Sequence, residues 1–450
     1  MHKAKIITIL IILISTVFSF SFTASAASRF DIIDTPINRP DHAAIVRLQQ
    51  TGIISGYADH TFRPDKPVNR AEALKMILKG SGINVPTGSG MDNFTDTDSN
   101  AWYSDFILIA LSMEIIDGYP DKTFRPNQTI NLVETMKILL QANNTDLSNI
   151  KNTSNPYQDT ISGQWYIKYL QYGKDNKLID PDMRNNIHPN LQMTRGRLAE
   201  LIYRMIKLHE GLMPAQKLRA EQLISLFENG TTEIQYGFVK KLNDGRGITA
   251  GRAGFTTATG DAYEVVKRYA AKHPTTPLAS YLPELKKLAS ARSDDTGNLS
   301  GFENAWEKAA QDQLFRDTQD EVVNEFYFYP AMRHADDLGL IFPLSRALIY
   351  DTIIQHGDGE DPDGLPALIR RTNTAAEGSP LTGLDEKEWI KTFLRIRRED
   401  LSNSYDESTR AGWAVSVSRC DVFSLIMKDN NYLLEGPIVI NTINYQGTTD

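Results

Sequence analysis

Apolar residues recur at helical spacing through much of this chain, and short polar loops separate the periodic segments. Between residues 215 and 227 the apolar positions lie three or four residues apart, which predicts a helix with one buried face. Pro214 suits the first turn of this helix, and Gly230 suits its exit. Glu228 follows Ile224 by one turn, so we expect its carboxyl at the edge of the buried face.

The rest of the second half shows further helical periodicity and one β pattern. The β pattern spans residues 231–255 and contains Asn-Asp-Gly-Arg-Gly, a strong signal for a tight turn. Asp244 lies in this polar turn, so we expect its carboxylate to be exposed and ionised. The helices that the periodicity predicts span residues 262–271, 302–315, 318–326 and 344–355.

Glu228 and Asp244 are two carboxyls that the pattern places in opposed surroundings. A carboxyl held against apolar groups resists ionisation, as a general acid requires, whereas a carboxylate in a polar turn stays ionised, as a base requires. Glycoside hydrolysis uses such a pair. The pattern alone is weak evidence, because most Asp-Gly pairs are only turns and most glutamates at helix ends are only solvated.

An internal repeat fills residues 27–208. The loop Gly56–Pro64 returns as Gly118–Pro126, and a weaker third copy ends at Pro189. Each copy reads helix, turn-rich loop, helix, and a fixed period indicates clustered copies of one supersecondary unit. An Asp-Thr pair lies upstream of each loop, at residues 34–35, 96–97 and 159–160.

The second helix of each copy begins beside a candidate ligand-binding position. In the first copy Asn69 can cap this helix, and Arg70 adds a guanidinium to its positive N-terminal pole, which favours a carboxylate ligand. Arg195 has the same position in the third copy, whereas the second copy has Leu132 there and should bind poorly or not at all. The alternative is that each arginine only pairs with a neighbouring glutamate on the surface.

Length and composition indicate the class of protein and the charge of its partner. A chain of 450 residues should form more than one domain, and 41% hydrophobic with 23% charged residues is typical of a soluble globular protein. The net charge of −8 argues against nucleic acid and favours a cationic partner. Cys420 is the single cysteine, so we expect a buried small hydrophobic residue there instead of an intramolecular disulfide.

The first residues have the pattern of a secretory signal peptide. A short basic region precedes a nearly unbroken apolar run from Ile6 to Phe22, and Ala24-Ser25-Ala26 is a small-residue cleavage pattern. The alternative is an uncleaved membrane anchor. No other run approaches transmembrane length, so we expect no membrane span after cleavage.

The sequence contains no motif that is typical of a metal site or a cofactor site. No cluster of His, Cys and Asp has the spacing of metal ligands, and no Gly-rich loop follows a strand in the way that a phosphate-binding loop does. Gly245 and Gly247 fit a turn instead. We therefore expect no metal and no cofactor.

The second half resembles the chitosanases of glycoside hydrolase family 46 over roughly residues 212–445. The resemblance is specific, because many segments match in order. The matching segments are Phe227–Tyr236, Asp244–Gly247, Gly254–Asp261, Tyr281–Leu285, Tyr350–Gly359, Asn431–Tyr432 and Gly436–Ile438.

This resemblance implies a two-lobed, lysozyme-like helical fold and hydrolysis of chitosan with inversion. By their match, Glu228 is the general acid, Asp244 is the base, and Thr249 helps to hold the attacking water. For His356 the alternative is a structural histidine with satisfied hydrogen bonds. The resemblance further implies substrate contacts at Asp261 (to the amine of a glucosamine unit), Arg246 and His356, and an ion network behind the acid made of Asp351, Arg397 and Arg410.

The repeats of the first half resemble S-layer homology modules, through the Gly-Tyr-x-Asp-x-Thr-Phe-Arg-Pro loop and Val68–Glu72. This resemblance implies that three modules form a pseudo-threefold head. It also implies that grooves of the head bind pyruvylated secondary cell-wall polysaccharide through Arg70 and Arg195.

The complete prediction is a mainly α protein with a helical repeat head and a two-lobed, lysozyme-like α+β catalytic domain that contains a small β-hairpin region. We expect a secreted endo-chitosanase attached to the wall of a Gram-positive type cell. The alternatives are a muramidase-like wall hydrolase on the same scaffold and a catalytically inactive surface protein. The expected boundaries are 1–26 for the signal peptide, 27–83, 84–145 and 146–208 for the repeats, and 209–450 for the catalytic domain.

Overall fold

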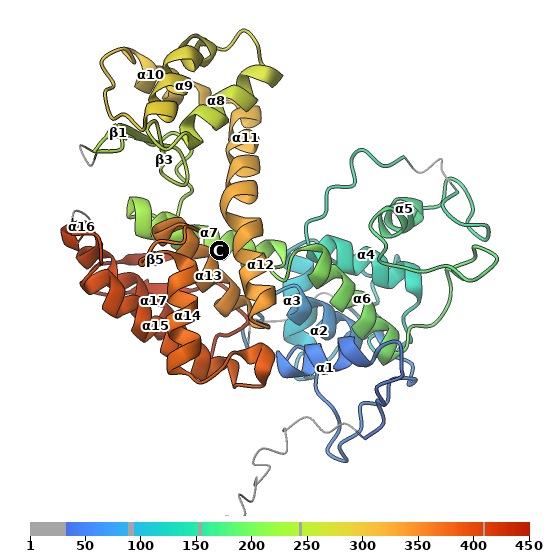
Figure 1. Cartoon of the computed structure of the whole chain (residues 1–450). Helices are drawn as coiled ribbons and strands as arrows, with labels where there is room; N and C mark the ends of the chain where they lie inside the picture. The colour runs from blue at the N-terminus through green and yellow to red at the C-terminus, as the bar shows by residue number, and fades with distance from the viewer. Residues whose placement is uncertain (1–32, 89–93, 152–154, 243–244, 408–409) are drawn as a thin grey trace, which may run out of the picture.

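The protein is mainly helical and has two halves, each with a hydrophobic core of its own (Figure 1). The two cores meet at the junction of the halves, where Leu212 packs into the C-terminal core and Met213, the next residue, packs into the N-terminal one. None of the helices described here is long and apolar enough to cross a membrane. The computed structural model describes residues 33–88, 94–151, 155–242, 245–407 and 410–450, so the expected signal peptide and Asp244 lie outside the described residues.

In the N-terminal half, the three copies of the repeat share one set of contacts. Asp34, Asp96 and Asp159 each accept two backbone N–H groups, at 2.7–3.0 Å, from residues 28 and 29 positions later in the chain. The weak third copy therefore keeps the loop geometry of the other two. The helices of this half are α1 (His42–Gln50), α2 (Arg70–Gly80), α3 (Ser104–Ser112), α4 (Leu132–Ala142), α5 (Ile167–Asp175) and α6 (Arg195–Leu208).

The second helices of the three copies, α2, α4 and α6, begin next to one another. The segments just before them are joined in pairs by isolated β-bridges, so each copy contacts the other two. Asn69 caps α2 in a capping box with Glu72, as predicted. The bridges are Pro67 with Thr194, Asn69 with Thr129, and Asn131 with Gln192.

The C-terminal half has two lobes at the two ends of one long helical run (Figure 1). This run is α11 (Gln313–Val323), the π-helical segment η2 (Asn324–Phe328) and α12 (Tyr329–Asp337). One lobe contains the antiparallel sheet of β1 (Val239–Lys241), β2 (Ile248–Ala250) and β3 (Phe255–Thr256), with α8 (Asp261–Lys272), η1 (Pro277–Tyr281), α9 (Leu282–Ala291) and α10 (Phe302–Ala309). We call it the sheet lobe.

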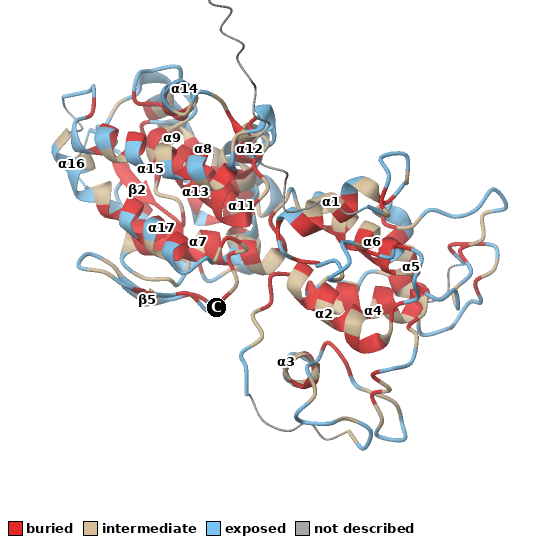
Figure 2. Cartoon of the chain, turned by 90° about the horizontal axis from the view of Figure 1, so that it is seen from below, coloured by how far each residue is buried: buried red, intermediate tan, exposed pale blue. Residues whose placement is uncertain are grey.

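The other lobe is built around two helices, α7 (Pro214–Asn229) and α13 (Pro343–His356), which are buried along most of their length (Figure 2). We call it the helical lobe. Its other elements are α14 (Leu365–Ala375), η3 (Pro380–Thr382), α15 (Glu386–Ser402), α16 (Arg410–Ala414), η4 (Val415–Val417), α17 (Ser418–Lys428), and a hairpin of β4 (Val439–Asn441) and β5 (Gln446–Thr448).

The predicted helices 262–271 and 344–355 and the β segment are confirmed, but the helix predicted over 302–315 is two helices. The chain breaks there because the Asp312 side chain accepts the backbone N–H of Leu314 and starts α11. The hairpin of β4 and β5 was not expected, since strands of three residues are too short to show alternation.

Arg252 connects the two lobes. Its guanidinium is buried between Glu221 of α7, at 2.9 Å, and Asp320 of α11. Tyr236, on the connection from α7 to the sheet, donates from its hydroxyl to Asp320 at 3.1 Å. These contacts fix the helical lobe relative to the base of the sheet lobe.

Candidate active site

Glu228 lies on the last turn of α7, one residue before the helix ends at Asn229. Gly230 follows with a φ of 73°, a left-handed conformation that glycine adopts without strain. The Glu228 side chain is 28% exposed, and its Oε1 accepts a hydrogen bond from the Arg419 guanidinium at 2.5 Å. The predicted apolar setting is therefore incomplete, because a cation contacts this carboxyl.

Behind Glu228 the charges continue into the interior as an ordered chain. Arg419, in the first turn of α17, donates to Asp351 Oδ1 at 3.0 Å, and Asp351 Oδ2 lies 2.6 Å from the Arg397 guanidinium. The side chains of these three residues are at most 3% exposed. Buried charges persist only when they are paired, so each member of this chain depends on the next.

Arg410 does not belong to this network, contrary to the prediction. It lies on the short helix α16, donates from Nε to the Ser404 carbonyl oxygen at 2.7 Å, and pairs with Glu407 at 3.2 Å. Arg419 has the predicted role instead. One signal was available in the sequence: an arginine inside a half-apolar segment is rarely buried unless a carboxylate pairs with it.

His356 does not reach a substrate, contrary to the prediction. Its side chain is fully buried, with Nδ1 2.9 Å from the Asp363 carbonyl oxygen and Nε2 accepting from Arg397 Nε at 3.3 Å. Burial, reinforced by the Arg397 charge, lowers the pKa of His356 well below its usual range. The structural alternative is therefore the correct one.

Asp261 begins α8 on the sheet lobe. Its Oδ1 accepts hydrogen bonds at 2.6–3.0 Å from the Thr259 hydroxyl and from the backbone N–H groups of Thr256 and Ala262. Its Oδ2 accepts from the Tyr327 hydroxyl at 3.2 Å. Burial raises the pKa of Asp261.

Tyr327, which the sequence analysis missed, connects the surroundings of Asp261 with those of Glu228. The residue is half-buried, and its hydroxyl lies within electrostatic reach of Asp261, Glu228 and Arg246. Burial, followed by the Asp261 carboxylate, raises the pKa of Tyr327 well above its usual value. Tyr327 comes from the π-helical segment η2, and such irregular turns within a helical run are common at functional sites.

Thr249 and Arg246 flank the turn between β1 and β2. Thr249 is on β2, and its buried hydroxyl has no hydrogen-bond partner among the described residues. Arg246 is exposed, and its carbonyl oxygen accepts the N–H of Ala258 at 3.2 Å. The predicted base, Asp244, lies outside the described residues.

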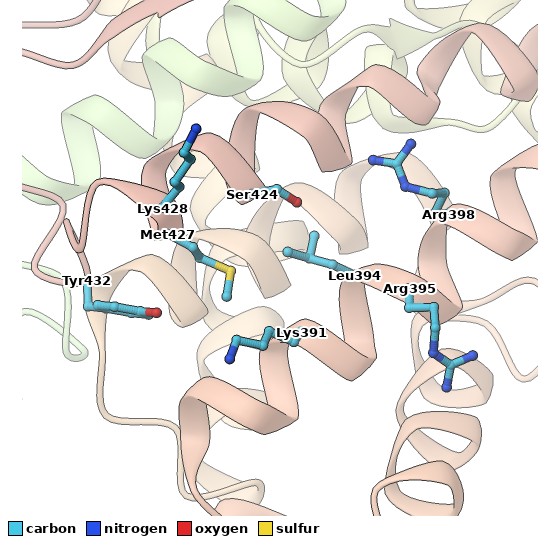
Figure 3. Close-up of a pocket in the computed structure, with 8 residues that line it drawn as sticks. All are labelled: Lys391, Leu394, Arg395, Arg398, Ser424, Met427, Lys428 and Tyr432. Atoms are coloured by element: carbon cyan, nitrogen blue, oxygen red, sulfur yellow. The ribbon is translucent and has the colours of Figure 1, made fainter.

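Two hollows among the described residues are not lined by Glu228. A pocket of about 420 Å³ between α15 and α17 has Leu394 and Met427 at its floor and basic side chains around them (Figure 3). A second hollow, of about 740 Å³, includes Glu233 and Tyr236 from the segment after α7. Within the described ranges no group of three His, Cys, Asp or Glu side chains could hold a metal ion.

Glu228 is a carboxyl at the end of a helix, backed by a buried ion network, and glycoside hydrolysis uses one such carboxyl as its general acid. The model of glycosyl hydrolase family 46 matches residues 222–438, and the model of the S-layer homology domain matches residues 41–74 and 93–132. Over 235 residues the chain is 56% identical to a chitosanase of Bacillus subtilis (strain 168), covering 52% of this chain and 85% of that protein. The chain therefore belongs to glycosyl hydrolase family 46, and its N-terminal half contains S-layer homology domains.

Two more similarities extend this result. A mutant chitosanase from Bacillus subtilis MY002, solved as a complex with 6 GlcN, has 53% sequence identity and a TM-score of 0.52, and covers 53% of this chain and all 100% of that one. A surface layer protein of Brevibacillus choshinensis is 24% identical over 193 residues, which are 42% of this chain and 15% of that protein. The two halves thus resemble two unrelated kinds of protein.

Proposed function

We propose that this protein is an endo-chitosanase that is held at the cell surface by its N-terminal half. The observation that supports this most is the carboxyl of Glu228, paired with Arg419 and Asp351, within a segment that is 56% identical to a Bacillus subtilis chitosanase. The substrate is chitosan, a polymer of glucosamine that carries positive charge. The net charge of −8 on the chain suits such a substrate.

Glu228 is the general acid in this proposal. It protonates the glycosidic oxygen, while Asp244, from the turn between β1 and β2, takes a proton from a water on the opposite face of the sugar. Thr249 holds that water, and the support for this is its buried hydroxyl, which has no hydrogen-bond partner in the part of the chain that the structure describes. The product then has the inverted configuration.

The substrate contacts in this proposal come from the sheet lobe. Asp261 binds the ammonium group of a glucosamine unit, and the Tyr327 hydroxyl orients the Asp261 carboxylate by its hydrogen bond. Arg246, exposed at the turn beside Asp244, contacts a neighbouring sugar. Asp351, Arg397 and Arg419 keep the acid in place and do not touch the substrate.

For the N-terminal half we propose three S-layer homology modules that form a pseudo-threefold head and bind a pyruvylated secondary cell-wall polysaccharide. Arg70 lies 4.9 Å from the Tyr119 ring, donates from Nε to the Phe124 carbonyl oxygen, and lines a hollow of about 150 Å³. Arg195 repeats these contacts with the Tyr57 ring and the Phe62 carbonyl oxygen. The second copy has Leu132 at this position and lacks the guanidinium.

The alternative, that each of these two arginines only pairs with a neighbouring glutamate on the surface, has partial support. Both are buried, and Arg70 lies 3.5 Å from Glu134, a glutamate of the next copy. The Tyr119 hydroxyl donates to the same Glu134 oxygen at 2.8 Å. A glutamate that already has a hydroxyl partner leaves part of the Arg70 charge for an incoming carboxylate.

The proposed division of the chain is a signal peptide (1–26), three modules (27–83, 84–145 and 146–208) and the catalytic domain (209–450). The contact of Leu212 with the C-terminal core and of Met213 with the N-terminal core supports a junction close to the last boundary. This division implies export to the wall of a Gram-positive type cell.

The test of this function is a digestion of chitosan and, in parallel, of peptidoglycan by the full chain. We expect new reducing ends and short glucosamine oligomers from chitosan only. Reducing ends from peptidoglycan alone would support the muramidase-like alternative, and no reducing ends from either would support an inactive surface protein.

A further inference from the structure

The ion network behind Glu228 does not end at Arg397. The Arg397 side chain is 0% exposed and has Asp351 on one side, at 2.6 Å. Its Nε donates to His356 Nε2 at 3.3 Å. The His356 imidazole therefore fixes the Nε edge of the Arg397 guanidinium, and the Asp351 carboxylate fixes the other edge.

The hydrogen bond from Arg397 determines where the proton of His356 lies. An arginine Nε–H can only donate, so His356 Nε2 accepts and the proton of the neutral ring is on Nδ1. That Nδ1 faces the Asp363 carbonyl oxygen at 2.9 Å and Asp400 Oδ2 at 3.6 Å. The neutral ring agrees with the lowered pKa of His356.

Asp400 extends the ion network from His356 towards the protein surface. It follows Arg397 by three residues on α15, so the two side chains share one face of the helix. Asp400 is 2% exposed at its side chain, and its Oδ1 pairs with Arg371 of α14, which is 44% exposed. Its Oδ2 is buried with no hydrogen bond among the described residues, which leaves it directed to the His356 ring.

We propose that His356 and Asp400 are positioning residues for the acid. They hold Arg397, which holds Asp351 and Arg419, and Arg419 holds Glu228. The links from Asp400 to Arg419 are buried, so a change at Asp400 is transmitted along this network to Glu228. The inference rests on the proposed function, because it concerns the same acid, and it extends that site to two residues that never contact the sugar.

Because the Asp400 carboxyl can be protonated, the support that it gives to Arg397 through His356 should depend on pH. The charged and titratable groups that face it are Arg371 of α14, His356 of α13, Arg397 on its own helix, and Asp361 and Asp363 of the loop before α14. Burial raises the pKa of Asp400 to about 6. The carboxylate therefore pairs with Arg371 above this pH, and the pair is lost as the pH falls through about 6.

The experiment compares the wild-type full chain with Asp400→Asn on soluble glucosamine oligomers. At about pH 7.5 we expect kcat to fall about tenfold with KM changed less than about twofold, the sign of a displaced catalytic group. At about pH 5 wild-type Asp400 is mostly protonated and resembles asparagine, so the ratio of the two kcat values should approach one. Arg395→Gln, on the exposed face of the same helix, is the matched control and should behave as the wild type.

A ratio that stays constant across this range, or an unchanged kcat at about pH 7.5, would overturn the inference. If Asp400→Asn does not fold, Arg371→Gln decides instead. Loss of Arg371 should raise the pKa of Asp400 and move the acidic limb of kcat to higher pH, and an unmoved limb contradicts the proposal. A wild type that cleaves no glucosamine oligomer contradicts the proposed function, whereas a normal wild type with unaffected variants contradicts this inference alone.

Discussion

The Arg419 guanidinium holds one oxygen of Glu228, and the side chain remains 28% exposed. A general acid needs a fixed direction and also access to the glycosidic oxygen. The buried Arg419 side chain fixes the direction of the Glu228 carboxyl, and the position of Glu228 at the end of α7 keeps that carboxyl accessible. We therefore expect that one substitution can remove the proton donor and that another can disturb the orientation of the Glu228 carboxyl.

Removal of the proton donor is tested by Glu228→Gln. The amide keeps the shape and still accepts from Arg419, so we expect a fall in kcat of at least about a hundredfold with an intact fold. Initial rates on chitosan measure this effect. Glu233→Gln is the control, since Glu233 is exposed on the segment after α7, and near-normal turnover in Glu228→Gln would refute the acid assignment.

Removal of the orientation is tested by Arg419→Lys beside Arg410→Lys. Lysine keeps the charge but cannot contact Glu228 and Asp351 with separate nitrogens of one planar group, so we expect kcat to fall at least about tenfold. Within the described part of the chain, Arg410 contacts Ser404 and Glu407, and its variant should keep full activity. Loss of activity in Arg410→Lys alone would restore the original prediction.

At the scale of elements, the pattern of apolar residues predicts α7, α8 and α13 well, because each helix is longer than two turns, although α13 is buried on nearly all sides instead of along one face. It fails where one side chain decides the outcome, as with Asp312 at the start of α11. The acid and Thr249 were assigned from matching sequence segments. Arg419 and Tyr327 were not, because only tertiary packing brings them to Glu228 from α17 and η2.

The caps of the repeat helices can be tested in the same terms. The Asn69 side chain accepts the backbone N–H of Glu72 at 2.8 Å, and the bridge from Asn69 to Thr129 joins two copies. Asn69→Ala should destabilise the N-terminal half by about 1 kcal/mol. A lower midpoint for the transition of this half in urea would confirm it. Asn100→Ala, in an exposed loop, is the control, and equal midpoints in the two variants would argue against the cap.

At the scale of the whole molecule, the N-terminal half packs against the helical lobe. Arg219, on the same helix as Glu228, donates from one nitrogen to the carbonyl oxygens of Gly82 and Leu434, both at 2.9 Å. Arg47 reaches the Leu340 carbonyl oxygen at 3.4 Å. The sheet lobe lies at the end of α11 that is farther from the N-terminal half (Figure 1), so attachment through that half is made on the side of the helical lobe.

Attachment to the wall is tested with the full chain and isolated sacculi. Arg70→Ala combined with Arg195→Ala should weaken binding at least about tenfold, because both proposed carboxylate contacts are lost. Cleavage of soluble chitosan should be unchanged and serves as the check on folding. Leu132→Ala is the matched control, since it alters the copy without the arginine. Equal binding by the double variant and the wild type would show that the arginines do not bind the polysaccharide.

The stereochemistry of cleavage depends on how the two lobes face each other. Inversion needs a water between the base and the sugar, and so a carboxyl separation of about 6.5–9.5 Å, whereas retention needs about 5 Å. Glu228 belongs to the helical lobe, and Asp244 comes after β1 of the sheet lobe in the sequence, so we expect the acid and the base to come from different lobes. The buried hydroxyl of Thr249 on β2, for which the described residues offer no hydrogen-bond partner, is the proposed contact of this water. We therefore expect the β-linked polymer to give products that first appear as the α-anomer. Proton NMR of a fresh digest, read before mutarotation, measures this, and an initial β-anomer would make Asp244 a nucleophile.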